Sequence, residues 1–215
     1  MSAITDNLDL YWQGFGSTLF LTVVAGVLSL VAGTLVATLR VSPVAGLRAL
    51  GATYVEVFRN TPLTVVFFFV AFVLPRLGPA LPFRAGALLA LTLYTSAFVC
   101  EAVRSGVNGV PVGQAEAARA IGLTFGQTLT LVVLPQALRA VVPPLISVFI
   151  ALTKNTSIAG AFFVGELFNV GRRLANANGD AVIAVLLGVA FFYLLITVPA
   201  GVLAGRLERR VAVAR

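Results

Sequence analysis

The sequence predicts an all-α membrane protein with five transmembrane helices, and three observations lead to that fold class. Apolar residues make up 59% of the 215 residues, charged residues only 11%, and the mean hydropathy is +1.01. A soluble domain carries about 25% charged residues, so this chain has too little polar material to cover a surface in water. Long uncharged runs recur along the chain, and the arginines lie in the gaps between them, as in inner-membrane proteins.

Each expected span rests on an uncharged stretch, because the hydrocarbon core takes about 20 helical residues. The first lies within thirty uncharged residues, and the second contains the run VVFFFVAFVL. The third opens with sixteen uncharged residues, and the fifth is uniformly apolar. The fourth is shorter and carries Pro143 and Pro144, which neighbouring helices can accommodate by satisfying the freed carbonyls. The expected spans are residues 16–39, 60–75, 85–103, 139–153 and 181–205.

A sixth uncharged segment, residues 120–138, is expected not to cross, because it is rich in Gly, Thr, Gln and Pro. With five spans and the N-terminus outside, ten of the fifteen basic residues lie on the inner side, including those of the segment Arg206–Arg215. If the sixth segment crossed, seven would lie inside and eight outside. The positive-inside rule therefore favours five spans, an outer N-terminus and a cytoplasmic C-terminus.

The connections complete a single transmembrane domain over residues 1–215. Residues 104–138 are expected to form a cytoplasmic loop. Residues 46–59 are expected to form a helix that lies against the membrane or leads into the second span. The segment 157–178 is expected on the outer side and partly helical.

Composition also excludes several functions. The net charge of +7 comes without a basic run interleaved with aromatic residues, so nucleic acid is not an expected partner. The chain has no His and one Cys, which excludes a disulfide framework, a Cys/His metal site and His-based catalysis. It has no G-x-x-x-x-G-K-[ST] phosphate loop, and its acids are scattered singly. We therefore expect no enzyme activity and no cofactor on this chain.

The inner loop contains the most informative pattern, GVPVGQAEAARAIGLTFGQTLTLVVLP. A short helix is expected from Gln114 to Ile121, with small residues on one side and Glu116 and Arg119 on the other. Gly122 would end it, as Gly does just past a helix. Small alanines permit the close approach of a partner. From these residues alone, a surface helix without any partner is an equally good interpretation.

The spacing of this loop resembles the EAA loop of the integral-membrane subunits of bacterial ATP-binding-cassette (ABC) importers. That pattern is E-A-A, three residues, G, nine residues, I, one residue, L-P, and this chain differs only by Val132 in place of Ile. In that family the loop docks on a cytoplasmic ATPase subunit. The resemblance implies a type I ABC importer permease fold. It also implies these coupling residues: Glu116, Ala117, Ala118, Arg119, Gly122, Leu134 and Pro135.

Three further segments are similar to the polar amino acid permeases within that family. They are FRNTPL from Phe58, AFVCEAVRSG from Ala97 and KNTS from Lys154. Asn60 and Ser105 depart from the common Gly, and Cys100 from the common Ala, which leaves the substrate open. The resemblance implies an importer subunit in the bacterial plasma membrane. Its implied partners are two ATPase subunits that bind ATP-Mg, a second permease subunit that is identical or paralogous, an extracytoplasmic solute-binding protein and the bilayer.

Polar residues within a membrane bundle are costly and tend to mark pathways. Glu101 and Arg104 are three residues apart and are predicted to pair, either as part of a pathway or as a structural ion pair. Lys154 either lines the pathway or extends to the outer headgroups. Glu166, Arg172 and Arg173 are expected to face outward. The candidate pathway residues are Arg59, Asn60, Thr61, Glu101, Arg104, Lys154, Asn155, Thr156 and Ser157.

The charges near these positions favour an anionic or neutral substrate. Glu56 and Glu101 each have an arginine three residues later, Arg59 and Arg104, which is expected to neutralise them. A cation in a dry cavity needs a counter-charge, so glutamate, aspartate or glutamine is favoured over arginine, lysine or histidine. Alternatively, the binding protein alone sets the specificity. An ion-coupled secondary transporter is the competing function, and the absence of acids inside the spans and of internal repeats weighs against it.

Overall fold

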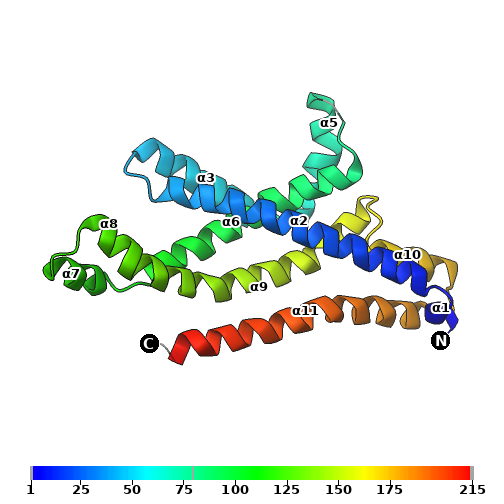
Figure 1. Ribbon diagram of the computed structural model, residues 1–215. Coiled ribbons are helices and arrows are strands. Elements are labelled where there is room, and N and C mark those ends of the chain that lie inside the picture. Colours follow the sequence, from blue (N-terminus) through cyan, green and yellow to red (C-terminus); the bar gives the residue numbers. More distant parts are fainter. Residues whose placement is uncertain (1, 79, 214–215) are drawn as a thin grey trace.

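The computed structural model describes residues 2–78 and 80–213, and all regular elements in that part of the chain are helical (Figure 1). The predicted all-α fold class is therefore confirmed. Two segments, η1 and η2, are π-helical and continue the α-helices on either side. The elements are α1 Ser2–Thr5, α2 Leu8–Arg40, α3 Ala45–Asn60, α4 Leu63–Phe68, η1 Phe69–Val73, α5 Leu74–Leu77, α6 Phe83–Asn108, α7 Val112–Ala120, α8 Phe125–Gln127, η2 Thr128–Val133, α9 Leu134–Ala161, α10 Leu167–Ala177 and α11 Val182–Val213.

The described residues contain four helices long and apolar enough to cross a membrane, and a bent pair, counted as one broken span, gives a fifth. The four are α2, α6, the α8–η2–α9 run and α11. The bent pair consists of α3 and the α4–η1–α5 run, which meet at 103°. The helices extend beyond the expected apolar stretches, because a helix continues into polar residues as long as its backbone bonds are made. The helix expected over residues 46–59 is α3.

The fourth span differs most from its expected bounds. Helices α8, η2 and α9 follow one another without a break from Phe125 to Ala161. The expected loop over residues 104–138 is thus helical in its last part, and the connection between α6 and α8 is residues 109–124. At the other end, hydroxyls in the KNTS run bond to carbonyls of the preceding turn, Thr156 to Thr153 at 2.8 Å and Ser157 to Lys154 at 2.7 Å. These hydroxyls are thus satisfied within the helix, which continues through the polar run to Ala161.

The two ends of the bundle carry different elements (Figure 1). Helix α7 and the C-terminal end of α11 lie at one end, whereas α1 and α10 lie at the opposite end. This arrangement places the predicted inner loop and the basic C-terminal segment together. Arg215, which the charge count places on the inner side, lies outside the described residues.

Helix α6 lies at the centre of the bundle and packs against α2 and α9. The contact with α2 is close because Gly33 has no side chain. A Cβ at this position would lie 2.6 Å from the Ser96 carbonyl oxygen and from Val99 Cβ. Buried hydroxyls add polar contacts between the same helices, such as Ser29 Oγ to the Thr92 carbonyl at 3.4 Å. Small residues and hydroxyls at such interfaces are how membrane helices associate without a hydrophobic driving force.

Candidate functional site: the exposed α7 segment and the Glu101 cluster

Helix α7 has the cap geometry that the sequence predicts. Its bounds are Val112–Ala120, close to the expected Gln114 to Ile121. The Leu123 amide donates to the Ala118 carbonyl at 3.2 Å, and the Gly122 amide donates to Arg119 at 3.0 Å. These two bonds make a Schellman motif, whose residue after the helix has a positive φ. Gly122 has φ +91°, so its predicted role as the turning residue is confirmed.

The surface of α7 is largely uncovered. Glu116, Ala117 and Arg119 are exposed, whereas Ala118 is buried against the bundle. Apolar side chains around the helix are also exposed: Val112 by 73%, Ile121 by 80% and Phe125 by 76%. Helix α7 packs on η2 of its own chain. The EAA-pattern residues of this helix thus lie on an accessible element at one end of the bundle, and the described residues leave its neighbouring apolar side chains largely uncovered.

The last two residues of the pattern lie on a different helix. Leu134 and Pro135 open α9, and both are exposed. Val132, two residues earlier, lies in η2, the segment against which α7 packs. The pattern therefore runs from α7, which carries Glu116, through the turn at Gly122 and η2 to the start of α9.

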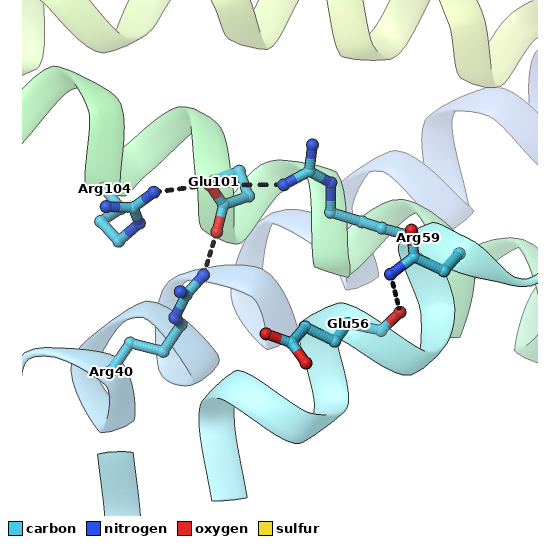
Figure 2. Close-up of polar contacts among 6 residues, drawn as sticks. Arg40, Glu56, Arg59, Glu101 and Arg104 are labelled. Atoms are coloured by element: carbon cyan, nitrogen blue, oxygen red, sulfur yellow. Dashed lines mark hydrogen bonds and ion pairs between the residues drawn. The ribbon is translucent and has the colours of Figure 1, made fainter. Parts of the chain in front are cut away.

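Glu101 is the centre of a charge cluster formed by three helices (Figure 2). Arg40 of α2 donates a hydrogen bond to Glu101 Oε1. Arg104 Nη2 donates to Oε2 at 2.8 Å, which confirms the predicted pair on α6. Arg59 Nη1, at the end of α3, lies 3.5 Å from the same oxygen. We call these four residues the Glu101 cluster; it holds one carboxylate against three guanidinium groups.

The expected pairing of Glu56 with Arg59 is wrong. The Arg59 guanidinium extends toward Glu101 (Figure 2). It also lies over the Phe98 ring, 5.8 Å from its centroid. Glu56 is exposed, and among the described residues its carboxylate has no ion pair. Water can solvate an exposed carboxylate, whereas the partly buried Glu101 gains more from a counter-charge, so Arg59 turns toward Glu101.

Asn60 and Thr61 lie at the break in the second span. The Asn60 side-chain amide donates to the Glu56 carbonyl at 2.9 Å and so satisfies a carbonyl at the end of α3. Thr61 has extended backbone angles, and Pro62 is the N-cap of α4. The residue before a proline avoids the helical region, which is why the span bends here. Arg59 therefore directly precedes the bend.

The KNTS residues point in different directions from α9. Thr156 is buried and Lys154 is exposed. Asn155 lines a groove of about 400 Å³ between α6 and α9, together with residues that include Tyr94, Thr95, Phe98 and Ser147. Phe98, one of these lining residues, also has the Arg59 guanidinium over its ring. Ser157 faces a second groove of about 460 Å³, lined mainly by phenylalanines.

The expectation that Glu166 faces outward is wrong. Its side chain is 0% exposed and caps the start of α10, accepting from the Asn169 amide at 2.7 Å and the Phe168 amide at 3.0 Å. Tyr193 of α11 donates to it at 2.7 Å and Thr18 of α2 at 3.5 Å. Burial raises the pKa of the Glu166 carboxyl above its ordinary value. Arg172 and Arg173 are exposed, as expected.

Sequence reasoning did not identify Thr18 and Tyr193 as partners of Glu166. The available signal was an acidic residue directly before the amphipathic stretch LFNVGRRL, a position that caps a helix N-terminus. Neither hydroxyl has a local signature, because both come from distant helices. Among residues 2–78 and 80–213, no three His, Cys, Asp or Glu side chains are grouped to hold a metal ion.

The comparison with protein families agrees with the geometry. Residues 29–213 match the family described as "Binding-protein-dependent transport system inner membrane component". The chain belongs to this family. It is thus a permease subunit of an ABC importer, a multi-pass membrane protein and not an enzyme.

The permease is similar to amino acid permeases along nearly its whole length. It is 41% identical to the probable glutamine ABC transporter permease protein GlnM of Bacillus subtilis, over 98% of this chain and 97% of that protein. It is 40% identical to the glutamate transport system permease protein GluC of Corynebacterium glutamicum, over 93% and 92%. A chain in the crystal structure of an amino acid ABC transporter with histidines matches it with a TM-score of 0.90 and 27% identity, over 96% of both chains.

Proposed function

We propose that this permease imports a polar amino acid, glutamate or glutamine, and that ATP hydrolysis on separate subunits drives the transport. In this proposal two cytoplasmic ATPase subunits bind ATP-Mg and dock on α7. A second permease subunit, identical or paralogous, completes the pathway, because five spans are too few to enclose one. A solute-binding protein delivers the substrate from outside.

The observation that carries the proposal is the exposure of the α7 segment. A short helix with a fixed C-terminal cap presents Glu116 and Arg119 next to Ile121 and Phe125, whose side chains are largely uncovered. Exposed apolar side chains of this kind, rimmed by charge, are typical of a protein–protein contact. This surface suits the groove of a partner at the membrane face, which is the role implied by the EAA pattern.

The preference for an anionic or neutral substrate rests on the lining of the groove between α6 and α9. Asn155, Ser147, Tyr94 and Thr95 offer amide and hydroxyl groups, and no carboxylate lines it. The Arg59 guanidinium lies over the ring of Phe98, one of the lining residues. A cationic side chain would enter this groove without a counter-charge, which is costly, whereas a carboxylate or an amide would find donors. The glutamate and glutamine permeases among the relatives have the same substrate class.

The test is uptake by the reconstituted complex of this permease with its ATPase and its binding protein. Labelled glutamate and labelled glutamine are offered with ATP inside the vesicles, and unlabelled aspartate, arginine or lysine competes. We expect ATP-dependent uptake of glutamate or glutamine that excess arginine does not inhibit. Uptake driven by an ion gradient in the absence of ATP, or strong inhibition by arginine alone, would overturn the proposal.

A further inference from the structure

The Glu101 cluster contains every ion pair found among the described residues of the permease. Its members come from α2, α3 and α6, so one carboxylate connects the end of the first span, the bend of the second span and the third span (Figure 2). Glu101 and Arg40 are each 21% exposed. A simple structural anchor would need one arginine, whereas here three arginines share one acceptor group.

The three arginines hold Glu101 unequally. Arg40 and Arg104 each donate a hydrogen bond to it, one to each carboxylate oxygen. Arg59 lies at 3.5 Å without a hydrogen bond, and its side chain is 45% exposed, more than those of the other two. An exposed pair at this distance contributes little free energy. Arg59 can therefore separate from Glu101 while the carboxylate keeps two counter-charges.

Arg59 and Glu101 lie at two different places in the fold, the bend of the second span and the C-terminal part of α6. Arg59 directly precedes the break at Asn60, where the second span turns by 103°. Glu101 lies on α6 only about 10 Å, at 1.5 Å per residue, from the helix end at Asn108. Residues 109–111 then connect α6 to α7, which begins at Val112. Only this short connection separates α7 from α6, so α6 offers a direct path along the chain from α7 to the carboxylate beside the bend.

The structure assigns to Glu101 the role of a positioning residue for coupling: its contact with Arg59 holds the end of α3 beside the bend of the second span, and this contact breaks and forms again as α7 moves in each transport cycle. The assignment rests on the proposed docking of an ATPase on α7. The role does not require Glu101 or Arg59 to contact the substrate. In it, the Glu101–Arg59 pair decides whether ATP hydrolysis and the opening of the pathway occur together.

The experiment measures two rates in the reconstituted complex: ATP hydrolysis without binding protein and substrate, and ATP hydrolysed per amino acid imported. Arg59→Gln removes only the weakest partner, so it is the variant expected to assemble normally, as judged by size-exclusion chromatography. Glu101→Gln removes the charge that all three arginines share, so it is expected to have the larger effect. Arg48→Gln is the matched control, because Arg48 is an arginine of the same helix whose side chain bonds only to the backbone carbonyls of Ser42 and Pro43.

We expect Arg59→Gln to raise the ratio of ATP hydrolysed to amino acid imported by about fivefold or more, the lower end of coupling between two sites. Arg48→Gln should leave it unchanged, and Arg59→Lys should restore most of it. If Arg59→Gln lowers uptake and hydrolysis in equal proportion, or changes neither, the residue is only structural and the assignment is wrong. A wild-type complex in which substrate and binding protein do not stimulate hydrolysis would instead contradict the proposed function.

Discussion

Gly122 is the position where the structure allows the cost of a substitution to be estimated most directly. A Cβ there would meet no atom within 4 Å, so Gly122→Ala introduces no clash. The cost is conformational, because φ is +91° and an L-residue in the left-handed region loses about 1–2 kcal/mol. The Schellman cap is expected to open about 5- to 30-fold more often, since 1.4 kcal/mol is tenfold in an equilibrium constant.

Amide hydrogen exchange in the purified permease–ATPase complex measures this opening. The amides of Ile121, Gly122 and Leu123 donate to the last carbonyls of α7, and their exchange should accelerate by that factor in Gly122→Ala. Gly113→Ala is the matched control, because Gly113 lies inside α7, has equal space around it and lacks a positive φ. There, alanine stabilises the helix by about 0.5–1 kcal/mol.

Uptake should be lowest in the variants whose α7 cap amides exchange fastest. Asparagine tolerates the left-handed region better than alanine, so Gly122→Asn should retain more transport than Gly122→Ala. Equal exchange and equal uptake in Gly122→Ala and Gly113→Ala would refute the idea that the left-handed turn positions the docking helix.

Three other predictions follow from exposed and buried charges. Glu116→Lys should abolish uptake and substrate-stimulated ATP hydrolysis while membrane insertion stays normal, because it reverses an exposed charge on the proposed docking face; normal uptake would contradict that role. Burial raises the pKa of the Glu166 carboxyl above 4.5, so the unfolded chain loses this proton first. Stability is therefore full below pH 4.5 and falls as the pH rises to the raised pKa. Thermal unfolding in detergent should show this slope in the wild type and not in Glu166→Gln; an equal slope in both would exclude Glu166 as its source. Cysteines introduced by Arg119→Cys and Asn176→Cys should react from opposite faces of the membrane, and labelling of both from one face would overturn the five-span topology.

The sequence was sufficient for the features that are local. Apolar stretches predict the spans, because each transmembrane helix must make its backbone hydrogen bonds within itself. A glycine after a short helix predicts the turn at Gly122, and a spacing of three residues predicts the pair of Glu101 with Arg104. In each case the interacting groups are a few residues apart, so the helical geometry alone brings them together.

The features that depend on packing were not predictable in this way. Arg40 and Arg59 reach Glu101 only because α2 and α3 lie against α6. The local rule instead paired Arg59 with Glu56, which is equally close in sequence to Arg59 as Glu101 is to Arg104. The two carboxylates differ in exposure, and exposure is a property of the folded bundle. The loop was expected to extend to residue 138 for a related reason: polar composition indicates poor contact with lipid, but it does not prevent a helix.

Glu166 shows why a charged residue between two spans need not lie on the surface. A buried carboxylate is costly unless donors surround it, and here two backbone amides and two hydroxyls do so. Those donors come from α10, α2 and α11, so the same contacts that satisfy the buried carboxyl group also connect α10 to two spans. The charged residues that α10 itself contributes, Arg172 and Arg173, are both basic and exposed. Because Glu166 is buried at the start of this helix, the charged side chains that the helix exposes are both positive. The contacts of Glu166 also hold the helix to the bundle.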